Sequence, residues 1–182
     1  GGQGVILGTI IIAEAAFLDG KKVVQSQSYG PEARGGMCKA ETIIDEKNIN
    51  YTKVEIPSLL LSLTQISFNK YSKKIGPDTV IIVDEEIDVP LRLRAKHEVL
   101  SLPILCSAKE VIKNPMAANI IAVGAVNEAL QIASVKSLEE AVLNHIPKGT
   151  EELNIKAMRL GAELVKQSRE EDKKGEEKKA HA

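Results

Sequence analysis

A glycine-rich segment precedes a long apolar one. Gly2, Gln3 and Gly4 are followed by residues 5–18, in which Glu14 is the only charged residue. A glycine turn that leads into a helix leaves backbone N–H groups unpaired at the helix start, where the helix dipole adds about half a positive charge. Glycine also lets a phosphate approach the backbone closely. We expect either an anion site here or a tight turn that binds nothing, and the glycines alone do not decide between them.

A second glycine-rich segment spans residues 29–36, with the sequence Tyr-Gly-Pro-Glu-Ala-Arg-Gly-Gly. Arg34 carries a planar guanidinium that suits a phosphate or a carboxylate, and the glycines after it let the backbone lie against a ligand. Glu32 either orients Arg34 or pairs with it in solvent, as in a surface loop of no function. If both glycine segments lie at the carboxyl ends of neighbouring strands, they meet where open α/β sheets bind ligands. From these residues alone, the segment is either a ligand-binding loop around Arg34, Gly35 and Gly36 or a surface loop with an ion pair between Glu32 and Arg34.

The sequence lacks the motifs that several classes of enzyme require. The glycine pattern fails as a dinucleotide fingerprint, because Leu7 occupies the position of the third small residue and residues 25–28 contain no acid. The sequence contains no P-loop, no HExxH segment and no nucleophile elbow. Asp84 and Glu85 follow an apolar run, where a carboxylate could act as a base, although a solvated strand end is the simpler interpretation. We expect no catalytic residue, and therefore an isolated chain that is inactive.

The ligands for a metal centre are too few. Cys38 and Cys106 are the only cysteines and lie far apart, and His97, His145 and His181 do not cluster. Zinc and iron–sulfur sites need about four such ligands. We expect no metal site and two free thiols, as in a reducing compartment.

Composition and charge argue against a nucleic-acid-binding or membrane-spanning protein. The chain has 182 residues, 3% aromatic residues, no Trp and a net charge of −1. A basic surface interleaved with aromatics is absent, which argues against nucleic acid as the partner. Residues 5–18 are too short and too interrupted to span a membrane, and no basic leader precedes them. We expect a soluble, cytoplasmic protein with a single domain over residues 1–168 and a charged, flexible tail over residues 169–182.

Apolar runs and capping residues locate the elements. The sequence predicts strands at residues 21–28, 37–45, 79–83 and 100–105. It predicts helices over residues 5–18, from Pro57 to Tyr71, from Ala108 onward, after Asn114 and Pro115, after a Ser137–Glu140 capping box, and after Thr150. The helix after Pro115 carries an alanine stripe that allows close packing: Ala118, Ala122, Ala125 and Ala129.

Alternation of helices and short apolar strands indicates an α/β protein. The expected fold is a Rossmann-like three-layer arrangement with a mainly parallel sheet. A glycine turn of this kind normally follows a strand, so we expect the first strand to be missing or truncated.

Four segments of the sequence resemble a known family. The segments Gly1–Val5 and Ser28–Gly36 resemble the two signature loops of the gamma subunit of 2-oxoacid:ferredoxin oxidoreductases. The segments Leu61–Gln65 and Asn119–Gly124 resemble further parts of it, and the similarity extends to about Leu164. The charged tail and the absent first strand depart from the pattern.

The resemblance implies an oxidoreductase complex that converts a 2-oxoacid to an acyl-CoA, CO2 and reduced ferredoxin or another acceptor. Coenzyme A would be a co-substrate, with thiamine diphosphate and iron–sulfur clusters on alpha, beta and delta-type partner subunits. By this resemblance, Gly2, Gln3 and Gly4 would face a CoA phosphate. The second loop would face CoA or the partner subunits, through Tyr29, Glu32, Arg34, Gly35 and Gly36. The loop sequences are most similar to those of 2-oxoglutarate enzymes, which form succinyl-CoA. Pyruvate and branched-chain 2-oxoacid enzymes remain alternatives.

Two other functions stay open. The chain could be an assembly subunit that binds no ligand and contacts partners through its alanine stripe. An independent dinucleotide-dependent reductase is a weaker alternative. An isolated gamma-type subunit with exposed partner surfaces could also form a homodimer.

Overall fold

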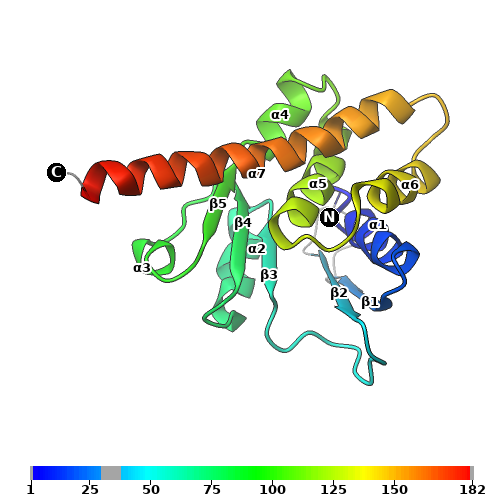
Figure 1. Ribbon diagram of the computed structural model, residues 1–182, viewed down its shortest axis with the longest axis horizontal. Helices are drawn as coiled ribbons and strands as arrows, with labels where there is room; N and C mark the ends of the chain where they lie inside the picture. The colour runs from blue at the N-terminus through cyan, green and yellow to red at the C-terminus, as the bar shows by residue number, and fades with distance from the viewer. Residues whose placement is uncertain (1, 30–37, 181–182) are drawn as a thin grey trace.

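The computed structural model describes residues 2–29 and 38–180, with the backbone alone at residue 29 and residues 175–180. It contains a three-stranded parallel sheet, a separate antiparallel hairpin and helices packed around both (Figure 1). The strands are β1 (Lys22–Tyr29), β2 (Cys38–Asp45), β3 (Leu59–Ser62), β4 (Val80–Asp84) and β5 (Val99–Leu102). The helices are α1 (Val5–Leu18), α2 (Gln65–Tyr71), α3 (Leu91–Arg94), α4 (Ile104–Glu110), α5 (Ala118–Leu130), α6 (Val135–His145) and α7 (Glu151–Ala180), with 3-10 turns η1 (Ser72–Lys74) and η2 (Pro115–Ala117).

The parallel sheet has the order β3-β4-β5 and is covered on both faces. Ile82 of β4 belongs to the main core with residues of α5 and α7, whereas Ile81 and Val83 pack with Phe68 of α2 on the other face. A strand buried on both faces needs a continuous apolar run, which is what the sequence provides. The α/β class and the strand near residues 79–83 are confirmed. The strand predicted at residues 100–105 is shorter than expected, because β5 ends at Leu102 and α4 begins at Ile104.

Strands β1 and β2 form an antiparallel hairpin in which Lys22 pairs with Asp45 and Tyr29 with Cys38. The expectation that these strands belong to one mainly parallel sheet is therefore wrong. The connection explains the difference, because residues 30–37 are too few for the crossover that parallel neighbours require, about a dozen residues or more.

Residues 59–62 form strand β3 instead of the first turn of a helix from Pro57. Strand β3 pairs in parallel with β4, with Leu59 opposite Val80. The following helix α2 begins only after Thr64, whose side chain accepts a hydrogen bond from the Ser67 amide at 3.4 Å. A short apolar run does not distinguish a buried strand from a buried helix, and here pairing with β4 decided.

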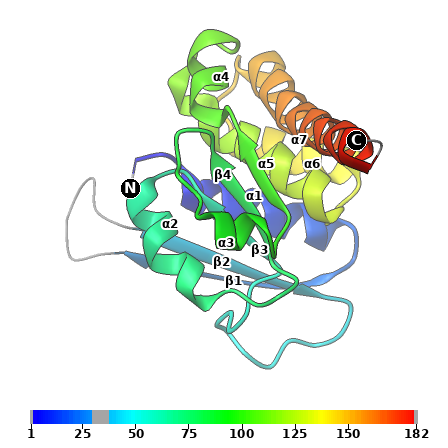
Figure 2. The same ribbon diagram turned by 90° about the vertical axis from the view of Figure 1, so that its left-hand side faces the viewer.

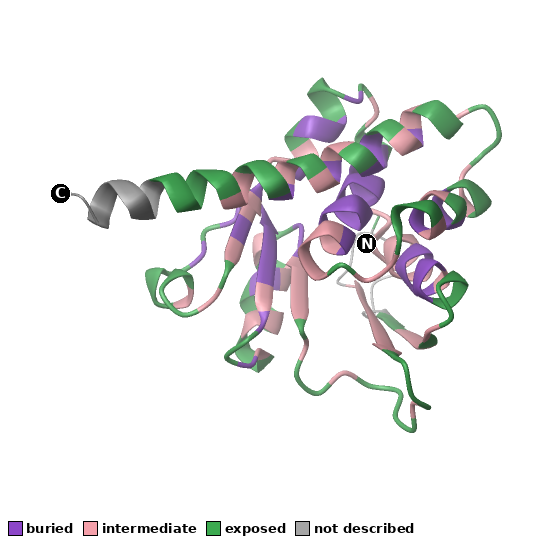
Figure 3. Cartoon of the chain, viewed as in Figure 1, coloured by how far each residue is buried: buried purple, intermediate pink, exposed green. Residues whose placement is uncertain are grey.

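Helix α5 occupies the centre of the molecule and α7 lies across it (Figures 1 and 3). Buried residues concentrate on β4 and α5, while one face of α7 is exposed. The close packing expected of the alanine stripe is confirmed, and α7 of the same chain packs closely against this helix.

The boundaries of α6 differ from the sequence-based expectation. Ser134, three residues before the predicted cap, is the N-cap of α6, and its side chain accepts a hydrogen bond from the Ser137 amide at 3.2 Å. The predicted Ser137–Glu140 box is wrong. Two serines three residues apart both suit a cap, and the backbone amide of Ser134 donates to Asp19 at the end of α1.

Helix α7 continues from Glu151 through Ala180, past the expected domain boundary at residue 168. Arg169 forms an ion pair with Glu98 at 2.7 Å and donates to the Ala129 carbonyl at 3.1 Å. The pKa of Arg169 is raised, first by its hydrogen bond to Glu98. The charged segment therefore begins as a packed helix; the division into a domain and a flexible tail stays a prediction. Among the residues described, we find no helix with the length and apolar character needed to cross a bilayer.

Candidate functional site

Helix α1 begins with amide groups that no side chain caps. Its N-cap residue Gly4 has φ 69° and Gly2 has φ 89°, in the left-handed region that favours glycine. The first turn contains no acidic residue. Because the first amides of a helix lack intrahelical partners and the dipole is positive there, this helix start favours a bound anion.

The start of α5 lies beside the start of α1, and the two helices run in the same direction (Figure 2). A Cβ built on Gly4 would lie 2.5 Å from Asn119 Nδ2, and one built on Gly8 would lie 3.4 Å from Val123 Cγ2. A step of four residues along α1 thus matches a step of four along α5. The positive ends of both helix dipoles therefore meet at one corner of the molecule.

Asn119 is a candidate that the sequence analysis did not select as a site residue. Its side chain is 7% exposed, and its amide nitrogen is the atom nearest the Cβ position of Gly4. The Oδ1 atom is buried without a hydrogen-bond partner among the described residues. A signal was present in the sequence, because Asn119 is the one polar side chain in the apolar run 115–125.

The structure brings only part of the predicted site together. Gly2, Gln3 and Gly4 lie at the start of α1, and Gln3 and Gly4 are half-buried. Tyr29 is the last residue of β1, where its backbone pairs with Cys38. The other expected residues lie outside the described part of the chain: Glu32, Arg34, Gly35 and Gly36.

The end of the β1–β2 hairpin at Tyr29 and Cys38 lies at the same corner. The Thr42 hydroxyl of β2 donates to the Thr9 carbonyl of α1 at 3.2 Å, which fixes the hairpin against the helix. From Thr42 to Cys38 the strand extends about 13 Å, and from Thr9 to Gly4 the helix extends about 7.5 Å. The hairpin end therefore reaches the level of the helix start, in agreement with both views (Figures 1 and 2).

Asp84 has a structural role instead of ending β4 in solvent. It is 1% exposed, and its Oδ2 accepts the Leu105 amide at the start of α4 at 2.8 Å. Its Oδ1 accepts the Glu86 amide at 3.3 Å. The solvated strand end expected from the sequence is wrong for Asp84, whereas Glu85 is exposed. Both oxygens of this carboxylate accept backbone amides, and Oδ2 caps the start of α4.

Contacts with α6 fix the middle of α1. The Glu14 carboxylate accepts a hydrogen bond from Asn144 Nδ2 at 2.6 Å and contacts the His145 ring. Burial raises the pKa of Glu14, but the hydrogen bonds from Asn144 and His145 and the charge on His145 outweigh it, so the pKa lies below its ordinary value. Glu14, the only charged residue in the apolar helix, thus joins α1 to α6.

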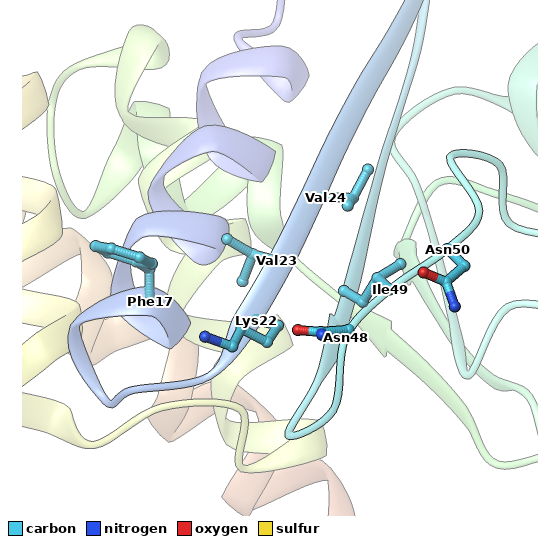
Figure 4. Close-up of a pocket in the computed structure, with 7 residues that line it drawn as sticks. All are labelled: Phe17, Lys22, Val23, Val24, Asn48, Ile49 and Asn50. Atoms are coloured by element: carbon cyan, nitrogen blue, oxygen red, sulfur yellow. The ribbon is translucent and has the colours of Figure 1, made fainter.

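The starts of α1 and α5, at Gly4 and Asn119, are called the glycine corner below. A surface pocket lies away from it. It is formed at the other end of α1 by Phe17, β1 and residues 48–50, and its volume is about 470 Å³ (Figure 4). Phe17 is 13 residues from Gly4, about 20 Å along a helix. Lys22 is the one charged residue of its lining, and the pocket lies at the carboxyl end of α1, where the helix dipole is negative, so we do not place the anion site there.

Residues 2–29 and 38–180 contain no group of three His, Cys, Asp or Glu side chains that could hold a metal ion. Cys38 is half-buried, Cys106 is exposed, and both are free thiols. What the corner can do chemically is bind negative charge through backbone amides.

Comparison with known proteins identifies the family. The model of the pyruvate ferredoxin/flavodoxin oxidoreductase family matches residues 1–164, and the chain belongs to this family. It is 41% identical over 169 residues to the 2-oxoglutarate synthase subunit KorC of Methanocaldococcus jannaschii, covering 92% of this chain and 90% of that protein. It is 31% identical over 166 residues to the pyruvate/ketoisovalerate oxidoreductases common subunit gamma of Pyrococcus furiosus, covering 87% and 89%.

Solved structures share the fold. The gamma subunit of the keto/oxoacid ferredoxin oxidoreductase from Geobacter sulfurreducens has 38% identity and a TM-score of 0.77, covering 91% of this chain and 93% of that one. The 2-oxoglutarate:ferredoxin oxidoreductase from Magnetococcus marinus, solved with 2-oxoglutarate, coenzyme A and succinyl-CoA bound, has 22% identity and a TM-score of 0.81. That match covers 92% of this chain and 30% of the other. The resemblance inferred from the two loops is confirmed.

Proposed function

We propose that this chain is the gamma-type subunit of a 2-oxoglutarate:ferredoxin oxidoreductase and that the start of α1 binds a phosphate group of coenzyme A in the assembled enzyme. The uncapped glycine corner, with two helix starts side by side, is the observation that carries the ligand assignment. The preference for 2-oxoglutarate rests on the KorC relatives, at 41% identity compared with 31% for the pyruvate/ketoisovalerate subunit.

The reaction converts 2-oxoglutarate and coenzyme A into succinyl-CoA and CO2, and the electrons pass to ferredoxin. Thiamine diphosphate supplies the decarboxylation chemistry and iron–sulfur clusters carry the electrons. The described residues hold no metal-ligand group, and two cysteines are too few for a cluster. In keeping with the family resemblance, we assign both cofactors to alpha, beta and delta-type partner subunits of a cytoplasmic complex.

The role of this chain is to hold a co-substrate. The amides at the start of α1, with Gly2, Gln3 and Gly4, would bind phosphate oxygens. The segment with Tyr29, Glu32, Arg34, Gly35 and Gly36 would complete the site. Both ends of that segment leave the hairpin beside the helix start, which is what supports its place in the site.

A charge test at Gln3 examines the proposal in the assembled enzyme. Gln3→Glu places a carboxylate beside the helix start and should raise the KM for CoA about tenfold, or ~1.4 kcal/mol of binding. Gln3→Lys has a similar length and should leave that KM unchanged or lower it. The KM values for 2-oxoglutarate and ferredoxin serve as internal controls.

Arg34 provides a second test of the proposed CoA site. Arg34→Ala should raise the KM for CoA, and Arg34→Lys should restore part of the affinity because it keeps the charge but loses the planar fork. Normal assembly together with an unchanged CoA KM in both Gln3→Glu and Arg34→Ala would refute the proposed ligand role.

The assembly-subunit alternative rests on apolar surface. Residues 5–10 of α1 are only half-buried, and Phe17, Leu91 and Met116 are largely exposed. The alanine stripe does not support it, because that helix is packed against α7 within the chain. Loss of co-purifying partners in Arg34→Ala, without any change in CoA kinetics of the residual complex, would favour this alternative.

Two further measurements test the oligomeric state and the substrate. Light scattering of the isolated subunit tests the homodimer, and assays with pyruvate and branched-chain 2-oxoacids test the substrate.

A further inference from the structure

Helix α5 contains two buried asparagines that differ in one respect. Asn119 is 7% exposed and Asn127 is 6% exposed. Asn127 Nδ2 donates to the Ala133 carbonyl at 3.0 Å, and its Oδ1 accepts the Ala133 amide at 2.9 Å. Asn127 thus closes the turn after α5 and is satisfied. The Asn119 carboxamide has no hydrogen bond to the described residues, and its Oδ1 is buried.

An unpaired buried amide is costly. Leaving such a group without a partner costs about 1–3 kcal/mol, and native proteins rarely retain it without a reason. Packing alone does not call for asparagine here, since the neighbouring buried positions 117, 118 and 120–123 are all Ala, Ile or Val. An alanine would also suit the helix better. The polar group at Asn119 therefore requires an explanation outside the packing of α5.

The location of Asn119 gives a role to its Nδ2 donors, whereas the buried Oδ1 is an acceptor that a phosphate does not pair. Its amide nitrogen lies closest to Gly4, and a Cβ on Gly4 would come within 2.5 Å of it. Gly4 is the N-cap of α1, so the carboxamide borders the amides that start this helix. Any side chain at residue 4 would displace the carboxamide, in addition to the strain at φ 69°. Gly4 thus allows Asn119 to reach the helix start.

We propose that Asn119 is a ligand-binding residue of the anion site at the start of α1, where its side-chain amide donates a hydrogen bond to a phosphate oxygen. The inference rests on the proposed function and adds a residue from a different element of the fold. The amide carries the only side-chain N–H donors of an asparagine, and donors are what a phosphate requires. The ligand class is a phosphate ester, of which coenzyme A is the candidate.

The test replaces the amide by a carboxylate of the same shape. In the assembled enzyme, Asn119→Asp should raise the KM for CoA at least tenfold, because it removes the donor and places a negative charge against the phosphate. The KM for 2-oxoglutarate and the turnover at saturating CoA should change less than twofold. Thermal protection of the complex by CoA, measured as a shift in Tm, should fall in parallel.

Asn127→Asp is the matched control. It makes the same change on the same helix, about 12 Å from Asn119, and also damages a buried asparagine. It should lower the Tm of the complex but leave the CoA KM and the CoA-induced Tm shift unchanged. An Asn119→Asp enzyme that behaves like Asn127→Asp overturns the inference, since Asn119 would then be structural. Asn119→Ser, which keeps a shorter donor, should give an intermediate CoA KM.

The two proposals fail in different ways. If Gln3→Glu and Gln3→Lys shift the CoA KM in opposite directions while Asn119→Asp has no effect, the anion site stands and Asn119 is excluded from it. If Gln3→Glu, Arg34→Ala and Asn119→Asp all leave the CoA KM of the assembled enzyme unchanged, both proposals are wrong.

Discussion

Gly124 of α5 and Gly161 of α7 face each other's helices across the crossing at the centre of the molecule. A Cβ on Gly124 would lie 1.9 Å from the Met158 carbonyl oxygen, and a Cβ on Gly161 would lie 1.9 Å from the Ile121 carbonyl oxygen. Each missing side chain makes room for the backbone of the other helix. This crossing joins α7 to α5, and α5 in turn carries Asn119 at the glycine corner.

We predict that Gly161→Ala lowers the free energy of unfolding by about 3 kcal/mol or more, because the methyl group meets backbone that can move only if the helices separate. Chemical denaturation, followed by far-UV circular dichroism, measures the effect. On an exposed helix face the same change is normally stabilising, since alanine is a better helix former. Lys156 is exposed on the same helix, and Lys156→Ala should be close to neutral. A Gly161→Ala protein of unchanged stability would contradict the close contact between the two helices.

Ser134, and not Ser137, should dominate the stability of the α6 start. Ser134→Ala removes the side-chain acceptor for the Ser137 amide and should cost about 1 kcal/mol. Ser137→Ala leaves this cap intact and removes a contact with Asp19, so its effect should be smaller. Urea denaturation of the two variants compares them directly. The reverse order would restore the capping box suggested by the sequence.

Asp19 should give the protein an acid-sensitive contribution to stability. The hydrogen bond from the Ser137 hydroxyl, followed by that from the Ser134 amide, lowers the pKa of Asp19 below its ordinary value of 3.8. Because the folded-state pKa is the lower one, this contribution is present above pH 3.8 and disappears as the pH falls through the folded-state pKa. The Tm difference between wild type and Asp19→Asn should therefore be largest near neutral pH and vanish in acid. A difference that is independent of pH would contradict this assignment.

Asp84 should matter for folding but not for turnover. Asp84→Ala removes the acceptor for the amide of half-buried Leu105 and should cost about 1–3 kcal/mol. Asp84→Asn keeps one acceptor oxygen and should cost less. In the assembled enzyme, kcat per folded complex should remain unchanged in Asp84→Asn. A large loss of kcat in a stable Asp84→Asn complex would instead indicate that this carboxylate takes part in the reaction.

The sequence alone determined the α/β class, the start of α1 and the family. Gly2 and Gly4 before an apolar helix indicate their structure locally, because positive φ and a helix start depend on neighbouring residues only. The run at residues 79–83 likewise identified β4, since a strand buried on both faces must be continuously apolar. The two loop segments carried the resemblance that the comparisons confirmed.

Tertiary structure decided what depends on partners distant in the sequence. Residues 59–62 became a strand because β4 offered a parallel neighbour, and Ser134 became the cap because its backbone amide donates to Asp19. Asp84 is a buried cap only because α4 begins above it. Asn119 became a site candidate because the packing of α5 on α1 places it directly against Gly4, although the two residues are far apart in the sequence. Such contacts join segments that no local pattern connects, so the residues beside the start of α1 are known only once the helices are packed.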